Sequence, residues 1–208
     1  TLMHNRVSQI IRVILVFSFL AASCLTFADQ TTAEKIEAAR QRAKEINEVK
    51  QVLADPDQAV RLAAFESMAT SDDPVMRSMA LDAGFASTDS LLRNTAFKYT
   101  VLGLKQIIIT LIVDTKAPKE IQEKSTKYLN ESGQSFKLDI NTKKIDLGTG
   151  KFERPNNSGY TGNVNGSLLT FSYGSFQGEL HLMEDNSLAG RISNPGWGYQ
   201  FNATASVR

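Results

Sequence analysis

Cysteine and histidine are nearly missing from this chain. Its 208 residues include a single cysteine, Cys24, and two histidines, His4 and His181. A zinc site usually takes three or four Cys, His or carboxylate ligands, so the sequence predicts no metal site. One cysteine also excludes a disulfide within the chain.

Nucleotide-binding motifs and strongly basic segments are missing as well. The sequence has no phosphate-binding loop, dinucleotide glycine fingerprint or calcium-loop pattern, and it predicts no cofactor. Without Arg6 and Arg12, the 23 basic residues become 21, against 22 acidic residues, and no basic patch stands out. Because nucleic-acid binding requires clustered cations, the sequence predicts no nucleic-acid partner.

The first 28 residues have the pattern of an export signal. Arg6 and Arg12 precede an uncharged apolar run, VILVFSFLAA, at 13–22, and this order is typical of a secretory signal peptide. The run is shorter than the roughly 20 apolar residues of a membrane span. We expect cleavage after Ala28 and a periplasmic or secreted mature chain.

An alternative processing site lies at Cys24. The segment LAASC at 20–24 resembles a bacterial lipobox, in which the cysteine is lipidated and anchors the protein to a membrane. A third alternative is a leader that stays uncleaved as an anchor. Contact with a membrane is expected in these two cases only.

Residues 29–104 are predicted to form a helical repeat region. Apolar residues at spacings of three and four indicate one long helix over 31–54, with Thr31 and Glu34 as its capping box. Its apolar stripe is thin and rich in alanine. We therefore expect a packed or solvated helix, with a coiled coil as the alternative.

Three segments, 54–69, 70–85 and 86–101, then repeat one pattern. Each has an aspartate at the expected N-cap, an arginine four residues later and an alanine three residues after that. These residues are Asp57, Arg61 and Ala64, then Asp73, Arg77 and Ala80, then Asp89, Arg93 and Ala96. A single short helix cannot bury its apolar face, so we expect stacked units. Each arginine is expected to bond an aspartate or carbonyls of a neighbouring unit, with anion binding as the alternative.

The start of each unit carries a resemblance to a known repeat family. ADPD at 54–57 and SDDP at 71–74, followed by Val60-Arg61 and Met76-Arg77, are similar to the HEAT-like repeats of bacterial α-solenoid proteins. The resemblance implies stacked helices and contact with another protein. It implies no enzymatic activity.

The period of the apolar residues changes to two from residue 134 to residue 208, which is typical of half-buried antiparallel strands. Asn165-Gly166 predicts a two-residue hairpin turn. Before this region, 105–133 is expected to connect the two parts through an apolar strand and a helix. The predicted fold is α+β: an N-terminal helical (HEAT-like) repeat region, then a C-terminal antiparallel β meander, closed as a small barrel or folded as a sandwich, with one packed helix.

Four glycines, Gly162, Gly166, Gly178 and Gly190, recur among the apolar residues of the β region. We interpret them as turn glycines alternating with core residues. Together with the order of helical repeats and β domain, the pattern resembles a recurring class of exported bacterial proteins. That resemblance implies a layout and no activity.

Four polar or aromatic residues are candidates for ligand binding: Trp197, Tyr199, Glu179 and His181. Trp197 lies in a loop between glycines, where it could stack on a sugar or anchor a protein; the alternative is that it folds back over the open end of the sheet. Glu179 and His181 are expected on one strand face, with a plain solvated surface as the alternative. Glu179 and Asp139 would form a hydrolytic carboxylate pair if their strands were neighbours.

The repeats, the β region and these candidate residues together suggest three functions. The leading hypothesis is a non-catalytic cell-envelope interaction or scaffold protein, whose partner is another envelope protein. The second is a glycan- or peptidoglycan-binding module that uses Trp197 and its neighbours. The third is a hydrolase with Glu179 and Asp139 as its carboxylates.

Overall fold

The computed structural model describes residues 31–155 and 161–207. The predicted leader, with Cys24, lies outside these residues. The chain divides into two units, Thr1–Glu48 and Val49–Arg208, and most of helix α2 (Thr32–Leu53) belongs to the first. In 31–155 and 161–207, no helix combines the length and the apolarity that crossing a membrane requires.

The predicted capping box begins α2. The backbone N–H of Thr31 donates to Glu34 Oε2 at 2.9 Å, and that of Glu34 donates to Thr31 Oγ1 at 3.3 Å. Each side chain therefore satisfies a backbone donor that the first helical turn leaves without a partner. Along the helix Ile36 is exposed and Leu53 is buried.

Three short helices follow in the second unit: α3 (Gln58–Ala69), α4 (Pro74–Ala86) and α5 (Ser90–Gly103). Asp57, Asp73 and Asp89 are their N-caps, and each carboxylate accepts backbone N–H groups of its own first turn. Consecutive helices pack against each other. The predicted caps are confirmed, and the likeness to HEAT repeats stays a prediction.

The recurring arginines fasten loops. Arg61 donates to the carbonyls of Asp55 at 2.7 Å and Pro56 at 2.9 Å, and to Asp89 Oδ2 at 2.8 Å. Arg77 donates to the carbonyl of Ser71. The bond from Arg61 to an aspartate of another unit agrees with the expectation, although Asp89 belongs to the third unit and not to the next one. All three carbonyls precede the arginine's own helix instead of belonging to a neighbouring unit.

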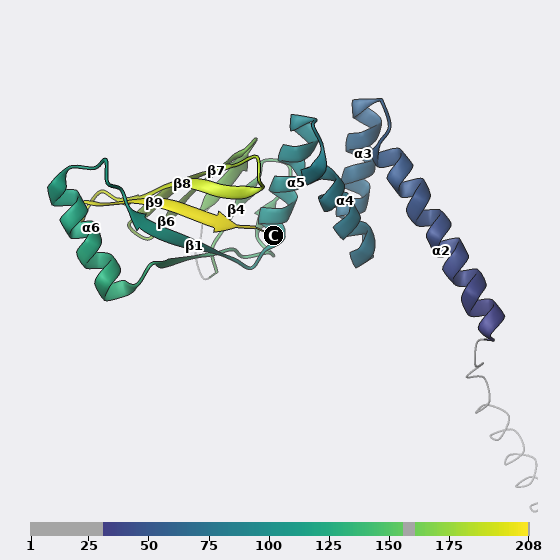
Figure 1. Ribbon diagram of the computed structural model, residues 1–208, viewed down its shortest axis with the longest axis horizontal. Coiled ribbons are helices and arrows are strands. Elements are labelled where there is room, and N and C mark those ends of the chain that lie inside the picture. The colour runs from purple at the N-terminus through teal and green to yellow at the C-terminus, as the bar shows by residue number, and fades with distance from the viewer. Residues whose placement is uncertain (1–30, 156–160, 208) are drawn as a thin grey trace, which may run out of the picture. The chain divides into compact units, whose positions relative to one another are not determined.

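The nine strands found in 31–155 and 161–207 belong to one antiparallel sheet, in the order β2-β1-β9-β8-β7-β6-β5-β4-β3. The sheet curls into a half-barrel (Figure 1) with β2 and β3 at its edges, so it is neither the sandwich nor the closed small barrel that the sequence predicted. The strands are β1 (Gln106–Val113), β2 (Ser135–Asp139), β3 (Ile145–Asp146), β4 (Lys151–Phe152), β5 (Gly162–Asn165), β6 (Leu168–Tyr173), β7 (Phe176–Leu182), β8 (Ser187–Asn194) and β9 (Tyr199–Ser206).

The segment 105–133 contributes to the sheet itself. Its strand β1 lies between β2 and β9, with Ile109 opposite Phe136 on one side and Ala205 on the other. Its helix is α6 (Lys119–Ser132). This segment therefore completes the half-barrel as well as linking the two parts of the chain.

A helix covers each end of the half-barrel, as Figure 1 shows for α5 and α6. On α5, Arg93 donates to Asn186 Oδ1 at 2.8 Å and to the carbonyl of Met183, which fastens the helix to the β7–β8 turn. On α6, Tyr128 packs on the rings of Phe176 and Phe201. Between them, alternate residues of each strand form the core.

The predicted Asn165-Gly166 turn is displaced by one residue. Asn165 pairs with Leu168, so the loop between β5 and β6 consists of Gly166 and Ser167. Gly166 has φ +58°. Because a left-handed first loop residue suits a tight hairpin and favours glycine, the loop is placed where Gly166 occupies that position.

Candidate functional site

Two turns and helix α6 form a groove at one end of the half-barrel, which we call the aromatic groove. Its volume is about 430 Å³. It is lined by Tyr128, Tyr173, Gly174, Ser175, Phe176, Asn194, Trp197 and Tyr199. These residues come from α6, the β6–β7 turn and the β8–β9 turn. Of the four residues proposed for ligand binding, Trp197 and Tyr199 meet here.

Trp197 stands at the edge of the groove with 66% of its surface exposed. Its ring stacks on that of Tyr199, with 6.4 Å between the centroids and 19° between the planes. Its backbone N–H donates to the carbonyl of Asn194 at 3.2 Å, and Gly198 after it has φ +69°. The turn therefore presents an indole face to solvent, and the side chain does not close the end of the sheet.

The floor of the groove is an aromatic cluster built by α6. The ring centroid of Tyr128 lies 4.9 Å from that of Tyr199 and 5.7 Å from that of Phe176. The sequence predicts Tyr128 only as a residue of the helix within 105–133, and its place under the groove was not predicted. The sequence gives little indication of this role, because a tyrosine on the apolar face of a helix has the same pattern whether it packs in the core or beneath a binding site.

Tyr173 gives one wall of the groove a fixed polar group. Its phenol donates to Asp139 Oδ2 at 2.9 Å, and the guanidinium of Arg154 lies 5.1 Å from its ring centroid. The hydrogen bond to the Asp139 carboxylate raises the pKa of Tyr173. The phenol therefore keeps its proton at neutral pH, and its bond to Asp139 holds the ring in place.

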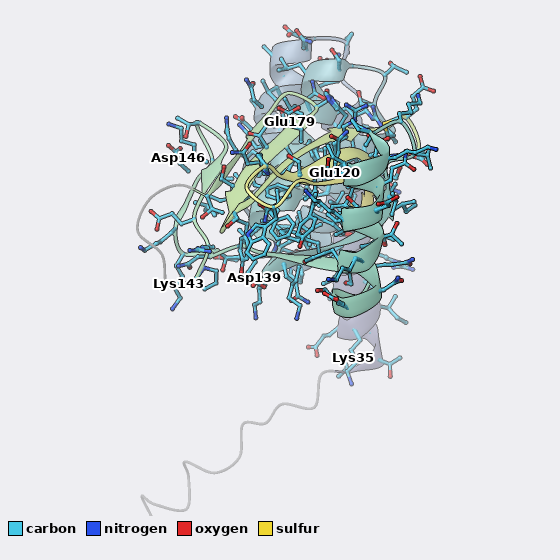
Figure 2. The ribbon with its side chains drawn as sticks, turned by 90° about the vertical axis from the view of Figure 1, so that its left-hand side faces the viewer. Lys35, Glu120, Asp139, Lys143, Asp146 and Glu179 are labelled. Carbon is cyan, nitrogen blue, oxygen red and sulfur yellow. The ribbon has the colours of Figure 1, made fainter. Side chains whose placement is uncertain are left out.

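The predicted carboxylate pair does not assemble. Asp139 is on β2 and Glu179 is on β7, and strands β1, β9 and β8 lie between them in the sheet. Figure 2 shows the two side chains well apart. The condition for the hydrolase hypothesis, neighbouring strands, is not met.

Glu179 lies on the outer face of the sheet, where it lines a second depression. This outer hollow has a volume of about 520 Å³ and is lined by Lys151, Thr161, Gly162, Asn163, Thr170, Phe171, Ser172, Gln177, Gly178 and Glu179. His181 is exposed on the same strand and lines neither the hollow nor the aromatic groove. The four proposed binding residues therefore do not form one site.

The helices enclose a third and larger depression, the helical groove, of about 810 Å³. Leu53, Met79, Ala83 and Leu92 are among its apolar lining residues, and Lys50, Asp55 and Asp82 are among its charged ones. Arg61 and Asp89 also line it and bond each other at 2.8 Å.

The Arg61–Asp89 bond decides between the two roles expected for the arginine. Arg61 and Gln58 both donate to the Asp89 carboxylate, which lowers the pKa of Asp89 to about 2. Asp89 is therefore ionised at neutral pH and already balances the charge of Arg61. This favours loop fastening over the binding of an external anion.

Residues 31–155 and 161–207 contain no group of three or more His, Cys, Asp or Glu side chains that could hold a metal ion. The three depressions offer aromatic faces, amides, hydroxyls and carboxylates instead. Comparison with protein-family models, with curated proteins and with solved structures finds no match to this chain.

Proposed function

We propose that this protein is an exported, non-catalytic binding protein of the bacterial cell envelope, and that its β domain binds glycan chains in the aromatic groove. The observation that carries the proposal is the exposed Trp197 ring, held parallel to Tyr199 at the edge of a groove. The export pattern of the first 28 residues supports the location. Peptidoglycan is the glycan that such a location makes available.

The groove has the chemistry that a sugar ring requires. A pyranose has apolar C–H faces, which pack on aromatic rings, and a polar edge of hydroxyls. Trp197 and Tyr199 supply rings, while Ser175 and Asn194 supply polar groups beside them. Its volume of about 430 Å³ falls within the roughly 300–1,000 Å³ of small-molecule sites, which are mostly apolar with a few placed polar groups.

Replacing Trp197 with alanine is expected to weaken glycan binding at least tenfold. An aromatic anchor at a binding site typically contributes about 2 kcal/mol or more, and about 1.4 kcal/mol corresponds to a factor of ten. Binding is measured by co-sedimentation with purified peptidoglycan sacculi and by calorimetry with oligomers of N-acetylglucosamine.

Two controls accompany this measurement. Trp197→Phe keeps a ring and should retain most of the affinity. Ile112→Ala removes an apolar side chain that is 53% exposed on β1, outside the groove, and should have no effect. Equal sedimentation of Trp197→Ala and the parent protein would show that the groove is not the binding site.

The helical groove favours a second candidate function, the binding of an envelope protein by the helical region. Its mixture of apolar and charged lining residues suits a protein segment with a few apolar side chains. This agrees with what the likeness to HEAT-like repeats implies. The two functions are compatible, since the groove of the β domain and that of the helices share no lining residue.

A photo-crosslinking amino acid at Ala86, which lines the helical groove, is expected to capture a defined partner in intact cells. The same substitution at Val75, exposed on the same helix but outside the groove, is the matched control. One product that forms from position 86 and not from 75, identified by mass spectrometry, supports the proposal. Identical products from both positions, or none from 86, contradict it.

A further inference from the structure

Polar side chains form ordered rows across the outer face of the sheet. One row follows the strand register from Lys151 to Asn163, Thr170, Glu179 and Arg191. Residues that are paired in this way lie side by side on one face, on strands spaced by roughly 4.8 Å. A second row begins with Ser172 and Gln177, which are also paired. The outer hollow lies where the two rows run over β4 to β7.

Two glycines without side chains form part of the base of this hollow. Gly162 and Gly178 line it, and an added Cβ would lie 2.4 Å from Phe152 Cζ or 2.1 Å from Phe171 Cζ. The two phenylalanine rings therefore occupy the space on the inner side where these residues have no side chain. The hollow is part of a rigid, close-packed layer, and its polar side chains project from a fixed base.

Asn163 carries an acceptor that no described residue satisfies. Its Oδ1 is buried and has no hydrogen-bond partner among the residues of the described chain. A buried polar atom without a partner destabilises the folded state, so such atoms in native proteins call for an explanation. Asn163 as a residue lines the outer hollow, so a rotation of its side chain on ligand binding would give Oδ1 a donor and remove this penalty.

We infer that the outer hollow is a second glycan-binding site, which binds adjacent hydroxyl groups of a sugar ring through hydrogen bonds. Glu179 accepts, Lys151 donates, and Gln177, Thr170 and Ser172 can do both, while Asn163 adds its amide once the side chain turns toward the ligand. Each sugar hydroxyl also donates once and accepts, so a pair of adjacent hydroxyls matches this mixed set. A purely anionic or cationic ligand would match only part of it.

The site is distinct from the aromatic groove, although the same hairpin contributes to both. Tyr173 and Phe176 line the groove, whereas Ser172, just before Tyr173, and Gln177, just after Phe176, line the hollow. Because side chains alternate along a strand, the two sites are on opposite faces of the β6–β7 hairpin. The inference stands whether or not the aromatic groove binds a glycan.

The test is an amide NMR titration of the full-length protein with two probes, the tetramers of glucose and of N-acetylglucosamine. Saturable shifts are expected at the amides of Asn163, Thr170 and Glu179 with at least one probe. Thr170→Val and Glu179→Gln, made singly, should each weaken this response several-fold, while well-dispersed spectra show that both variants fold. Thr204→Val, on the outer face of β9 and outside the hollow, should leave the response unchanged.

Trp197→Ala separates this inference from the proposed function. Shifts in the hollow that persist in Trp197→Ala, with loss of shifts around the aromatic groove, support both sites. Shifts in the hollow alone support the hollow and contradict the groove. The inference is overturned by hollow amides that do not shift with either probe, by shifts that survive both hollow substitutions, or by shifts that disappear in Trp197→Ala.

Discussion

Gly190→Ala is expected to destabilise the protein by about 3 kcal/mol or more. Gly190 lies inside β8, opposite Leu180 on one side and Ala203 on the other. A Cβ there would lie 1.9 Å from the carbonyl oxygen of Glu179 and 2.9 Å from Leu180 Cα. These are backbone atoms of a paired strand, so relief requires β7 and β8 to separate and their ladder to break.

The matched control is the same substitution at Gly103, the last residue of α5. An added Cβ at this position meets nothing within 4 Å. Gly103→Ala should leave stability unchanged or raise it by up to about 1 kcal/mol, because alanine loses less conformational entropy on folding. Urea unfolding followed by circular dichroism measures both. A Gly190→Ala variant within about 1 kcal/mol of the parent would contradict the close approach of β7 and β8.

Three strand glycines allow close approach within the curled sheet, and they correct the sequence interpretation. Gly162, Gly178 and Gly190 were interpreted as turn glycines, yet they lie within β5, β7 and β8, and only Gly166 of that pattern is in a turn. Glycine inside a strand permits close approach of another group or a sharp bend. Here aromatic rings or a neighbouring backbone fill the space that a side chain at these glycines would occupy. Glycine at defined strand positions is a known means of curving a sheet.

Local chemistry accounts for what could be predicted from the sequence. Asp57, Asp73 and Asp89 were identified as N-caps because a cap depends on the few residues that follow it. Strands such as Ser135–Asp139 were recognisable because alternation marks a half-buried strand. The half-barrel could not be predicted in the same way, since its curl depends on contacts between residues far apart in the chain.

The residues of the candidate sites differ in the same way: some have a local sequence signal, and others depend on contacts between distant parts of the chain. Trp197 was identifiable because a tryptophan between two glycines lies in a loop. Tyr128 and Tyr173 were not, because their alternation or helical spacing is that of core residues. The outer hollow depends on the pairing of Asn163 with Thr170 and of Thr170 with Glu179, which only the register of three strands reveals.

Tyr128→Ala is expected to lower the stability by about 3 kcal/mol and to abolish glycan binding in the aromatic groove. Large aromatic-to-alanine changes in packed sites cost about 3–5 kcal/mol, and Tyr128 is partly buried, which places it at the lower end. Its ring centroid lies 4.9 Å from that of Tyr199, 5.5 Å from that of Phe201 and 5.7 Å from that of Phe176. Each such pair contributes about 0.5–1.5 kcal/mol beyond its buried area.

Tyr128→Phe distinguishes this packing role from a hydrogen bond between the phenol and the ligand. It keeps the ring and should preserve both stability, measured by thermal unfolding, and binding to sacculi. A Tyr128→Ala variant with parental stability would contradict the role of α6 in closing this end of the half-barrel. Because Tyr199 packs on Tyr128 and Trp197 stacks on Tyr199, the ring on α6 supports the indole indirectly. The same contacts that complete the core at this end therefore hold the binding surface in place, and stability and affinity should be lost together.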